Sequence, residues 1–176
     1  QLSPASQPSN LHDLLLSQGY AKVSGAKVQT VGLEAFKTNT DITKVQLLDK
    51  PNDAWFSVYR KVEKATPHKE TIHTQMLQGI KPSAAFALLH LDNEPAAVGL
   101  GVFENGYTGI FNIATLGRFR GRGGASTILL ALAAWARAQQ GHTLYLQVGE
   151  ENLTAQRVYE KIGFRTLYSY WYLEAP

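Results

Sequence analysis

The sequence has 176 residues, of which 44% are hydrophobic, a formal net charge of +3 and no cysteine. This length suits one ordinary domain with its own core, and the lack of cysteine excludes disulfides and thiolate chemistry. No apolar run is long enough to span a bilayer and none resembles a secretion signal, so we expect a cytoplasmic protein without a membrane partner. Lysine and arginine are scattered rather than clustered, which argues against nucleic acid as a partner.

The N-terminal segment is expected to hold one helix and two strands. Leucines at helical spacing in residues 11–20 predict a short helix that stops at Gly19. The residues that follow predict two short strands, at 21–23 and 26–33.

A polar, turn-forming stretch at residues 36–42 predicts a boundary between an N-terminal segment, residues 1–40, and a main domain, residues 41–176. The main domain is expected to open with a strand at 44–49 and helices at 51–63 and 69–80.

Three apolar segments with short turns follow, at residues 84–92, 95–105 and 107–115, and they predict an antiparallel meander. The remaining elements alternate between helix and strand. We expect a helix after a glycine-rich loop, a strand at 143–148, a helix at 153–163 and a strand at 164–173. Together these elements predict a layered α/β sheet domain.

The glycine-rich loop RGRGGA occupies residues 120–125, between a strand and an apolar helix. Unpaired backbone N–H groups and the helix dipole combine at such a position to bind an anion. The glycines let the backbone approach phosphate oxygens, and nearby arginines add positive potential. The loop therefore suits a diphosphate.

Two nucleotide motifs do not fit this loop. The pattern GxxxxGK[ST] is absent because Arg122 and Gly123 occupy positions that require other residues, which disfavours a P-loop hydrolase. The dinucleotide pattern G-x-G-x-x-G fails because it would place Ser126 where glycine is required. An ordinary glycine-rich turn with solvent-facing arginines stays an alternative for this stretch taken alone.

A second segment, ENLTAQRVYEKIGF at residues 151–164, follows the strand at 143–148. Asn152 suits a helix N-cap and Gly163 a helix stop, so structure alone explains both. Tyr159 is open to two interpretations, because helical tyrosines commonly serve as half-buried packing residues.

The two segments together resemble the GNAT N-acetyltransferase superfamily. RGRGGA is similar to its acyl-coenzyme A loop, [QR]-x-x-G-x-[GA], with Arg120, Gly123 and Ala125 in the defined places, and residues 151–164 match N-x-x-A-x-x-x-Y-x-x-x-G-F at every named position. The resemblance covers about residues 42–176. It implies an α/β (α+β) fold with a mixed, mostly antiparallel, splayed sheet flanked by helices.

The resemblance also implies where acetyl-coenzyme A binds. Pantetheine would enter between the strands at 107–115 and 143–148 and pair with strand backbone, as an added strand does. The loop would hold the pyrophosphate, and no metal is implied. The implied cofactor-binding residues are Ile113, Ala114, Thr115, Arg118, Arg120, Gly121, Arg122, Gly123, Gly124, Ala125, Ser126, Asn152, Ala155 and Tyr159.

The implied reaction is direct attack of an amine on the thioester. Tyr159 would be the general acid that protonates the departing thiolate. Many family members carry a basic carboxylate on the strand equivalent to residues 107–115, but that strand has none here. Glu150 and Glu151 are our first candidates for the base, and Glu104 and His142 are the second candidates.

The expected function is N-acetylation of a small-molecule or peptide amine by a monomer or homodimer. The alternative is a catalytically inactive coenzyme A-binding sensor or regulatory module. His68, His73 and His90 do not share a metal-ligand spacing, so we interpret them as structural or surface residues.

Residues 11–23 loosely resemble residues 155–167 when Gly19 is aligned with Gly163, which places Leu15 opposite Tyr159. One hypothesis is that residues 1–40 are the tail of a degenerate GNAT-like half belonging to a longer polypeptide. A generic helix capped by glycine is an equally good interpretation.

Overall fold

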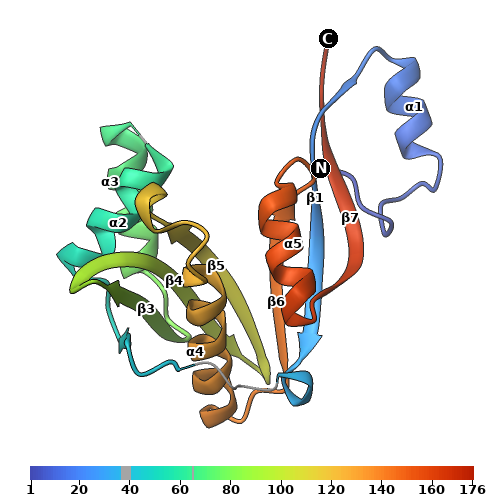
Figure 1. Cartoon of the computed structure of the whole chain (residues 1–176). Coiled ribbons are helices and arrows are strands. Elements are labelled where there is room, and N and C mark those ends of the chain that lie inside the picture. The colour runs from blue at the N-terminus through green and yellow to red at the C-terminus, as the bar shows by residue number, and fades with distance from the viewer. Residues whose placement is uncertain (37–40, 65) are drawn as a thin grey trace. The chain divides into compact units, whose positions relative to one another are not determined.

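The computed structural model describes residues 1–36, 41–64 and 66–176 (Figure 1). The chain forms two compact units. The larger comprises residues 32–144, and the smaller combines residues 1–31 with residues 145–176. Residues 1–31 of the predicted N-terminal segment therefore pack with the C-terminal end of the chain. The boundary predicted at residue 40 lies outside the described residues.

The larger unit is built on an antiparallel meander. Its strands lie in the order β2 (Val45–Leu48), β3 (Ser83–Leu91), β4 (Glu94–Glu104) and β5 (Tyr107–Thr115). The helices of this unit are α2 (Asp53–Glu63), α3 (Pro67–Gln78) and α4 (Gly124–Ala138), with 3-10 turns at η1 (Leu33–Ala35) and η2 (Gly117–Phe119).

The two faces of β4 contact different helices, because successive side chains of a strand point to opposite faces. Val98 and Leu100 belong to the apolar cluster beneath α2. Gly99 and Gly101 face α4 instead, where a side chain at either position would meet Leu132. The strand thus lies between α2 and α4.

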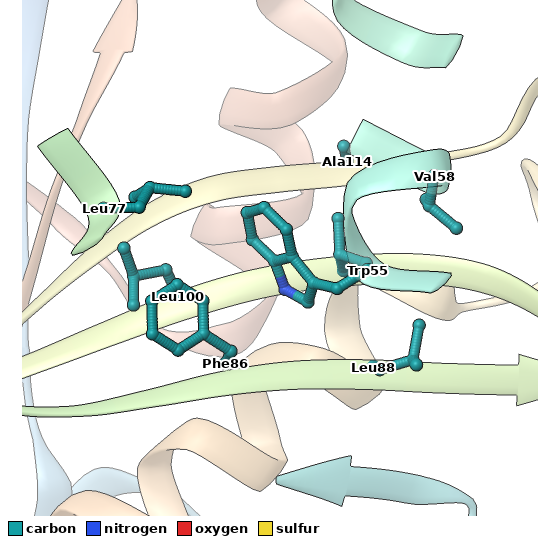
Figure 2. Packing of buried hydrophobic residues seen from close by; sticks show 8 residues of the cluster. Trp55, Val58, Leu77, Phe86, Leu88, Leu100 and Ala114 are labelled. Carbon is teal, nitrogen blue, oxygen red and sulfur yellow. The ribbon is translucent and has the colours of Figure 1, made fainter. Parts of the chain in front are cut away.

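Trp55 on α2 is the centre of the core of this unit (Figure 2). The indole is fully buried, and its Nε1 donates a hydrogen bond of 3.2 Å to the carbonyl oxygen of Gly99. Its ring meets Phe86 edge-on at 5.5 Å and stacks on Tyr59 at 5.5 Å. These contacts fix α2 against the sheet.

Strand β5 contains an irregularity opposite β4. The register shifts between the pairs Val98–Ala114 and Leu100–Phe111, which gives β5 an extra residue. Asn112 lies in this bulge with a φ of 54°, in the left-handed region that asparagine tolerates better than most residues.

The smaller unit contains α1 (Leu11–Ser17), β1 (Ala21–Gly32), most of β6 (Thr143–Gly149), α5 (Leu153–Ile162) and β7 (Arg165–Glu174). Strand β1 lies between β6 and β7 and pairs antiparallel with β7, with Gly25 opposite Trp171. Residues 2 and 171 form a further bridge at this edge.

The predicted elements are confirmed in type and order to within a few residues at their ends, except that two predicted strands are one. The two strands expected at 21–23 and 26–33 are one strand, β1, which continues through an irregular register between Lys22 and Ser24. Helix α3 begins at Pro67 rather than at 69, because Thr66 caps it and proline suits the first helical turn.

No helix in the described parts of the chain combines the length and apolar character that crossing a membrane requires.

The close approach of α4 to β4 gives the first testable prediction. A Cβ at Gly99 would lie 2.5 Å from Ile128 Cγ2 and 2.6 Å from Ile113 Cδ1. We expect Gly99→Ala to lower the free energy of unfolding by about 1–3 kcal/mol through overpacking. Gly117→Ala is the matched control, because nothing lies within 4 Å of a Cβ there. Urea unfolding measures both variants, and equal losses would contradict the packing argument.

Candidate functional site

The glycine loop leads from η2 into α4. Gly121 and Gly123 have φ values of 77° and 79°, which glycine adopts without strain, and Gly123 is the N-cap of α4. Ideal Cβ atoms at both positions would meet nothing within 4 Å, so the loop backbone borders open space. The prediction that these glycines keep the backbone accessible agrees with this geometry.

Helix α4 presents its first N–H groups beside this open space. The N–H groups of Gly124, Ala125 and Ser126 have no intrahelical acceptor by their position, and Gly123 supplies no capping side chain. Ile128, Leu129 and Leu132 are fully buried and hold the helix in place. The helix start is therefore a rigid arrangement of donors suited to an anion.

The arginines around the loop differ in their partners. Arg122 donates two hydrogen bonds to the Asp92 carboxylate, at 2.6 and 3.0 Å, and Arg118 pairs with Glu94. Both guanidinium groups also lie over the buried ring of Phe119, at 5.4 and 4.9 Å from its centroid.

The hydrogen bond from Arg122 lowers the pKa of Asp92, so that carboxylate stays ionised at neutral pH. For Arg120, which is exposed, the structure shows no ion pair with the described residues. The positive potential expected from three free arginines is therefore partly neutralised by two carboxylates of the β3–β4 turn.

The end of β5 lies next to the loop. A Cβ at Gly124 would lie 3.3 Å from Ala97 Cβ and 3.4 Å from Thr115 Cγ2, so Gly124 brings the start of α4 close to this strand. Ala114 and Thr115 pair with Val98 and Ala97 of β4. The structure thus brings the strand residues and loop residues of the predicted cofactor site together in one unit.

The other predicted residues lie in the smaller unit, on and before α5. Asn152 caps the helix, with its Oδ1 accepting a hydrogen bond of 3.1 Å from the N–H of Ala155. Tyr159 is buried, with its ring centroid 5.9 Å from that of Phe164. Burial raises the pKa of the Tyr159 phenol, which therefore keeps its proton throughout the neutral range.

The two carboxylates predicted as a base precede α5. Glu150 forms an ion pair of 2.8 Å with Lys22, whereas Glu151 is exposed. Of the second candidates for the base, Glu104 is exposed, and the ring of His142 lies edge-on against the ring of Tyr107 with centroids 4.7 Å apart.

Sequence analysis missed Gln156, which organises the start of α5. Its Nε2 donates hydrogen bonds of 2.9 Å to the carbonyl oxygens of Gly149 and Glu150, and its Oε1 accepts one of 2.8 Å from Lys27 Nζ. Its position three residues before Tyr159 places both on one helix face, which is the pattern that could have identified it as buried.

Within the residues that the structure describes, no group of three or more histidine or acidic side chains has an arrangement suited to a metal ion.

Comparison with known proteins identifies the family. The family model described as "Acetyltransferase (GNAT) family" matches residues 46–164, more than half of the sequence. The chain belongs to the GNAT acetyltransferase family. The resemblance inferred from the loop and from residues 151–164 is confirmed, and so is the mixed, mostly antiparallel α/β fold class.

Individual relatives are distant and longer than this GNAT chain. The uncharacterized N-acetyltransferase YobR of Bacillus subtilis is 24% identical over 168 residues, covering 94% of this chain and 68% of YobR. A GCN5-related N-acetyltransferase from Sphaerobacter thermophilus has a TM-score of 0.72 and 22% identity, with 95% of this chain and 56% of that chain covered. A functionally unknown protein from Staphylococcus epidermidis has the same TM-score at 14% identity, covering 99% and 70%. The structural matches support the fold alone.

The capping bond of Asn152 gives the second prediction. Asn152→Ala removes the side-chain acceptor for the N–H of Ala155 and should cost about 0.5–2 kcal/mol of folding free energy. Asn152→Asp keeps an equally good cap and should retain wild-type stability. Thermal or urea unfolding checks both. Equal stability of Asn152→Ala and the wild type would show that the cap is dispensable.

Proposed function

We propose that this GNAT chain transfers the acetyl group of acetyl-coenzyme A to a primary amine of a small molecule or peptide. The observation that carries the proposal is the open glycine loop at the start of buried α4, next to Thr115 at the end of β5. A loop of this kind suits the pyrophosphate of coenzyme A, and the family relationship favours acetyl transfer.

The loop is proposed to bind the pyrophosphate through the N–H groups of Gly124, Ala125 and Ser126. Arg120 adds charge, while Arg118 and Arg122 exchange their carboxylate partners for phosphate oxygens. That exchange costs little, because both ion pairs are exposed and screened by water. The backbone of Ile113, Ala114 and Thr115 is proposed to pair with the pantetheine amides.

Tyr159 is proposed to protonate the thiolate of coenzyme A as it leaves. Its raised pKa keeps the phenol neutral and able to donate a proton or hydrogen bond. With no cysteine in the sequence, the proposed reaction proceeds by direct attack of the amine rather than through an acyl-thiol intermediate.

Asn152 and Ala155 are proposed to contact the cofactor, and Glu150 and Glu151 are proposed as candidate bases. For Glu150 the ion pair with Lys22 opposes this role, because it already occupies a carboxylate oxygen. A monomer or homodimer, a cytoplasmic location, a division at residue 40 and a degenerate N-terminal half stay predictions.

Charge reversal in the loop tests cofactor binding. We expect Arg120→Glu to weaken acetyl-coenzyme A binding about tenfold, because it replaces attraction for a phosphate with repulsion. Lys81→Glu is the control, since it makes the same charge change at an exposed position between α3 and β3. Isothermal titration calorimetry measures both. A wild-type affinity for Arg120→Glu, or no binding by the wild-type chain, would contradict the proposal.

Removal of one hydroxyl tests Tyr159. We expect Tyr159→Phe to lower the rate of thiol release about 100-fold or more with acetyl-coenzyme A affinity unchanged, because phenylalanine fills the same volume but cannot donate a proton. Thiol-release assays with a panel of primary amines measure the rate, and calorimetry measures the affinity. Unchanged release would remove Tyr159 from the mechanism. Tight binding without release by the wild-type chain would favour the coenzyme A sensor instead.

A further inference from the structure

His73, on α3, is held by contacts to two other elements of the larger unit. Its imidazole stacks on the ring of Tyr59 of α2, with ring centroids 4.5 Å apart and an interplanar angle of 17°. Its Nε2 lies 3.1 Å from Nδ2 of Asn112 on β5. Stacking fixes the plane of the ring, and the hydrogen bond fixes its rotation within that plane.

The partner of His73 is the bulged residue of β5. Asn112 directly precedes Ile113, Ala114 and Thr115, the residues proposed to bind pantetheine, and its left-handed φ of 54° marks the bulge. With the Asn112 amide donating, Nε2 of His73 carries the lone pair and Nδ1 carries the proton. The basic nitrogen is thus directed at the strand proposed to bind the cofactor.

A pocket gives this imidazole access from solvent. It has a volume of about 190 Å³ and lies between α2 and α3, with Phe56, Tyr59, His73 and Thr74 among its lining residues. His73 is half-buried rather than enclosed. An amine with a small hydrocarbon body fits such a volume and can lie against the two aromatic rings.

The surroundings keep His73 neutral. Burial lowers its pKa below the ordinary value of 6.5 and outweighs the negative charge of Glu63, which raises it. The hydrogen bond donated by the Asn112 amide to Nε2 also favours the neutral ring, because protonation of Nε2 would break it. The other charged groups lining the pocket are Arg60, Lys69 and Glu70, and Glu70 pairs with Arg60 at 3.5 Å. At pH 7 the imidazole can therefore accept a proton.

We propose that His73 is the general base of the acetyl transfer, with Asn112 as its positioning residue. The inference rests on the proposed function.

The proposed reaction begins with proton transfer to His73. The acceptor ammonium replaces the Asn112 amide as donor to Nε2, one N–H bond of the ammonium breaks, and the proton moves to Nε2, giving an imidazolium. The neutral amine attacks the thioester carbon, the C–S bond breaks, and the thiolate takes the proton of Tyr159. The second amine proton leaves to solvent as the amide forms, and the imidazolium and phenolate return to their resting protonation states through solvent.

Substitution of His73 tests this role in the kinetics. With an amine identified by the panel assay, His73→Gln should lower kcat about 100-fold or more while acetyl-coenzyme A affinity is retained. The wild-type rate should fall as the pH drops through a pKa below 6.5, where His73 becomes protonated, and this limb should vanish in His73→Gln. His68→Gln, an exposed position on the same helix, should keep the wild-type rate and profile.

Asn112→Gly separates positioning from folding, because glycine accepts the left-handed φ of the bulge. Loss of the hydrogen bond that the amide donates to the neutral ring should raise the pKa of His73, so the acid limb should move to higher pH and kcat should fall, with the limb still present. An unchanged pH profile would remove Asn112 from the mechanism. Loss of rate in Glu150→Gln or Glu151→Gln, with His73→Gln fully active, would assign the base to a carboxylate.

Nuclear magnetic resonance tests the placement without an acceptor. The chain has five histidines, so the ring resonances can be assigned by single substitutions. Acetyl-coenzyme A should shift the His73 resonances and lower its titration midpoint further by covering the ring, while His68 stays unchanged. If calorimetry shows binding but His73 does not respond, the inference is overturned and the proposed function stands. If acetyl-coenzyme A does not bind, both are overturned.

Discussion

The packing of α4 against β4 is the constraint on which the proposed cofactor site depends. Gly99 and Gly101 remove the side chains that would hold the helix away from the strand, so Ile128 and Leu132 occupy the space next to the backbone. Because the helix body is buried, its first turn cannot reorient, and its N–H groups keep a fixed direction. A flexible loop would have to lose conformational entropy on binding an anion, whereas this one has already lost it during folding.

The same strand provides a second fixed point on its other face. Trp55 of α2 packs against β4, Tyr59 stacks on Trp55, and His73 stacks on Tyr59. The position of the imidazole is therefore tied through the ring of Tyr59 to Trp55, a fully buried side chain. Preorganisation of this kind matters for proton transfer, because a base must lie within hydrogen-bond reach of its proton.

The fold was largely predictable because its patterns are local. The meander of β3, β4 and β5 follows from apolar runs separated by tight turns, and α4 follows from a long apolar stretch after glycines. The loop and Tyr159 were recognisable by their spacing. The partners of the arginines were not, because Asp92 and Glu94 are 30 and 24 residues away from Arg122 and Arg118 and meet them only after the chain has turned back after β4. The bulge at Asn112 was also not predictable, because a strand with one extra residue has the same kind of sequence pattern as a regular strand.

The role proposed for His73 shows why a strand without a carboxylate does not imply a site without a base. The sequence motifs describe residues that are proposed to contact the cofactor, and the members of each motif are close in sequence because one loop and one helix supply them. A base for the acceptor need not contact the cofactor, so it need not lie on the strand itself. Here α3 supplies an imidazole to the strand, and Asn112 in the bulge supplies only a hydrogen bond. A carboxylate is unprotonated at neutral pH and can accept a proton, whereas an imidazole with an unshifted pKa would be partly protonated there. Burial lowers the pKa of His73 and so keeps the imidazole unprotonated.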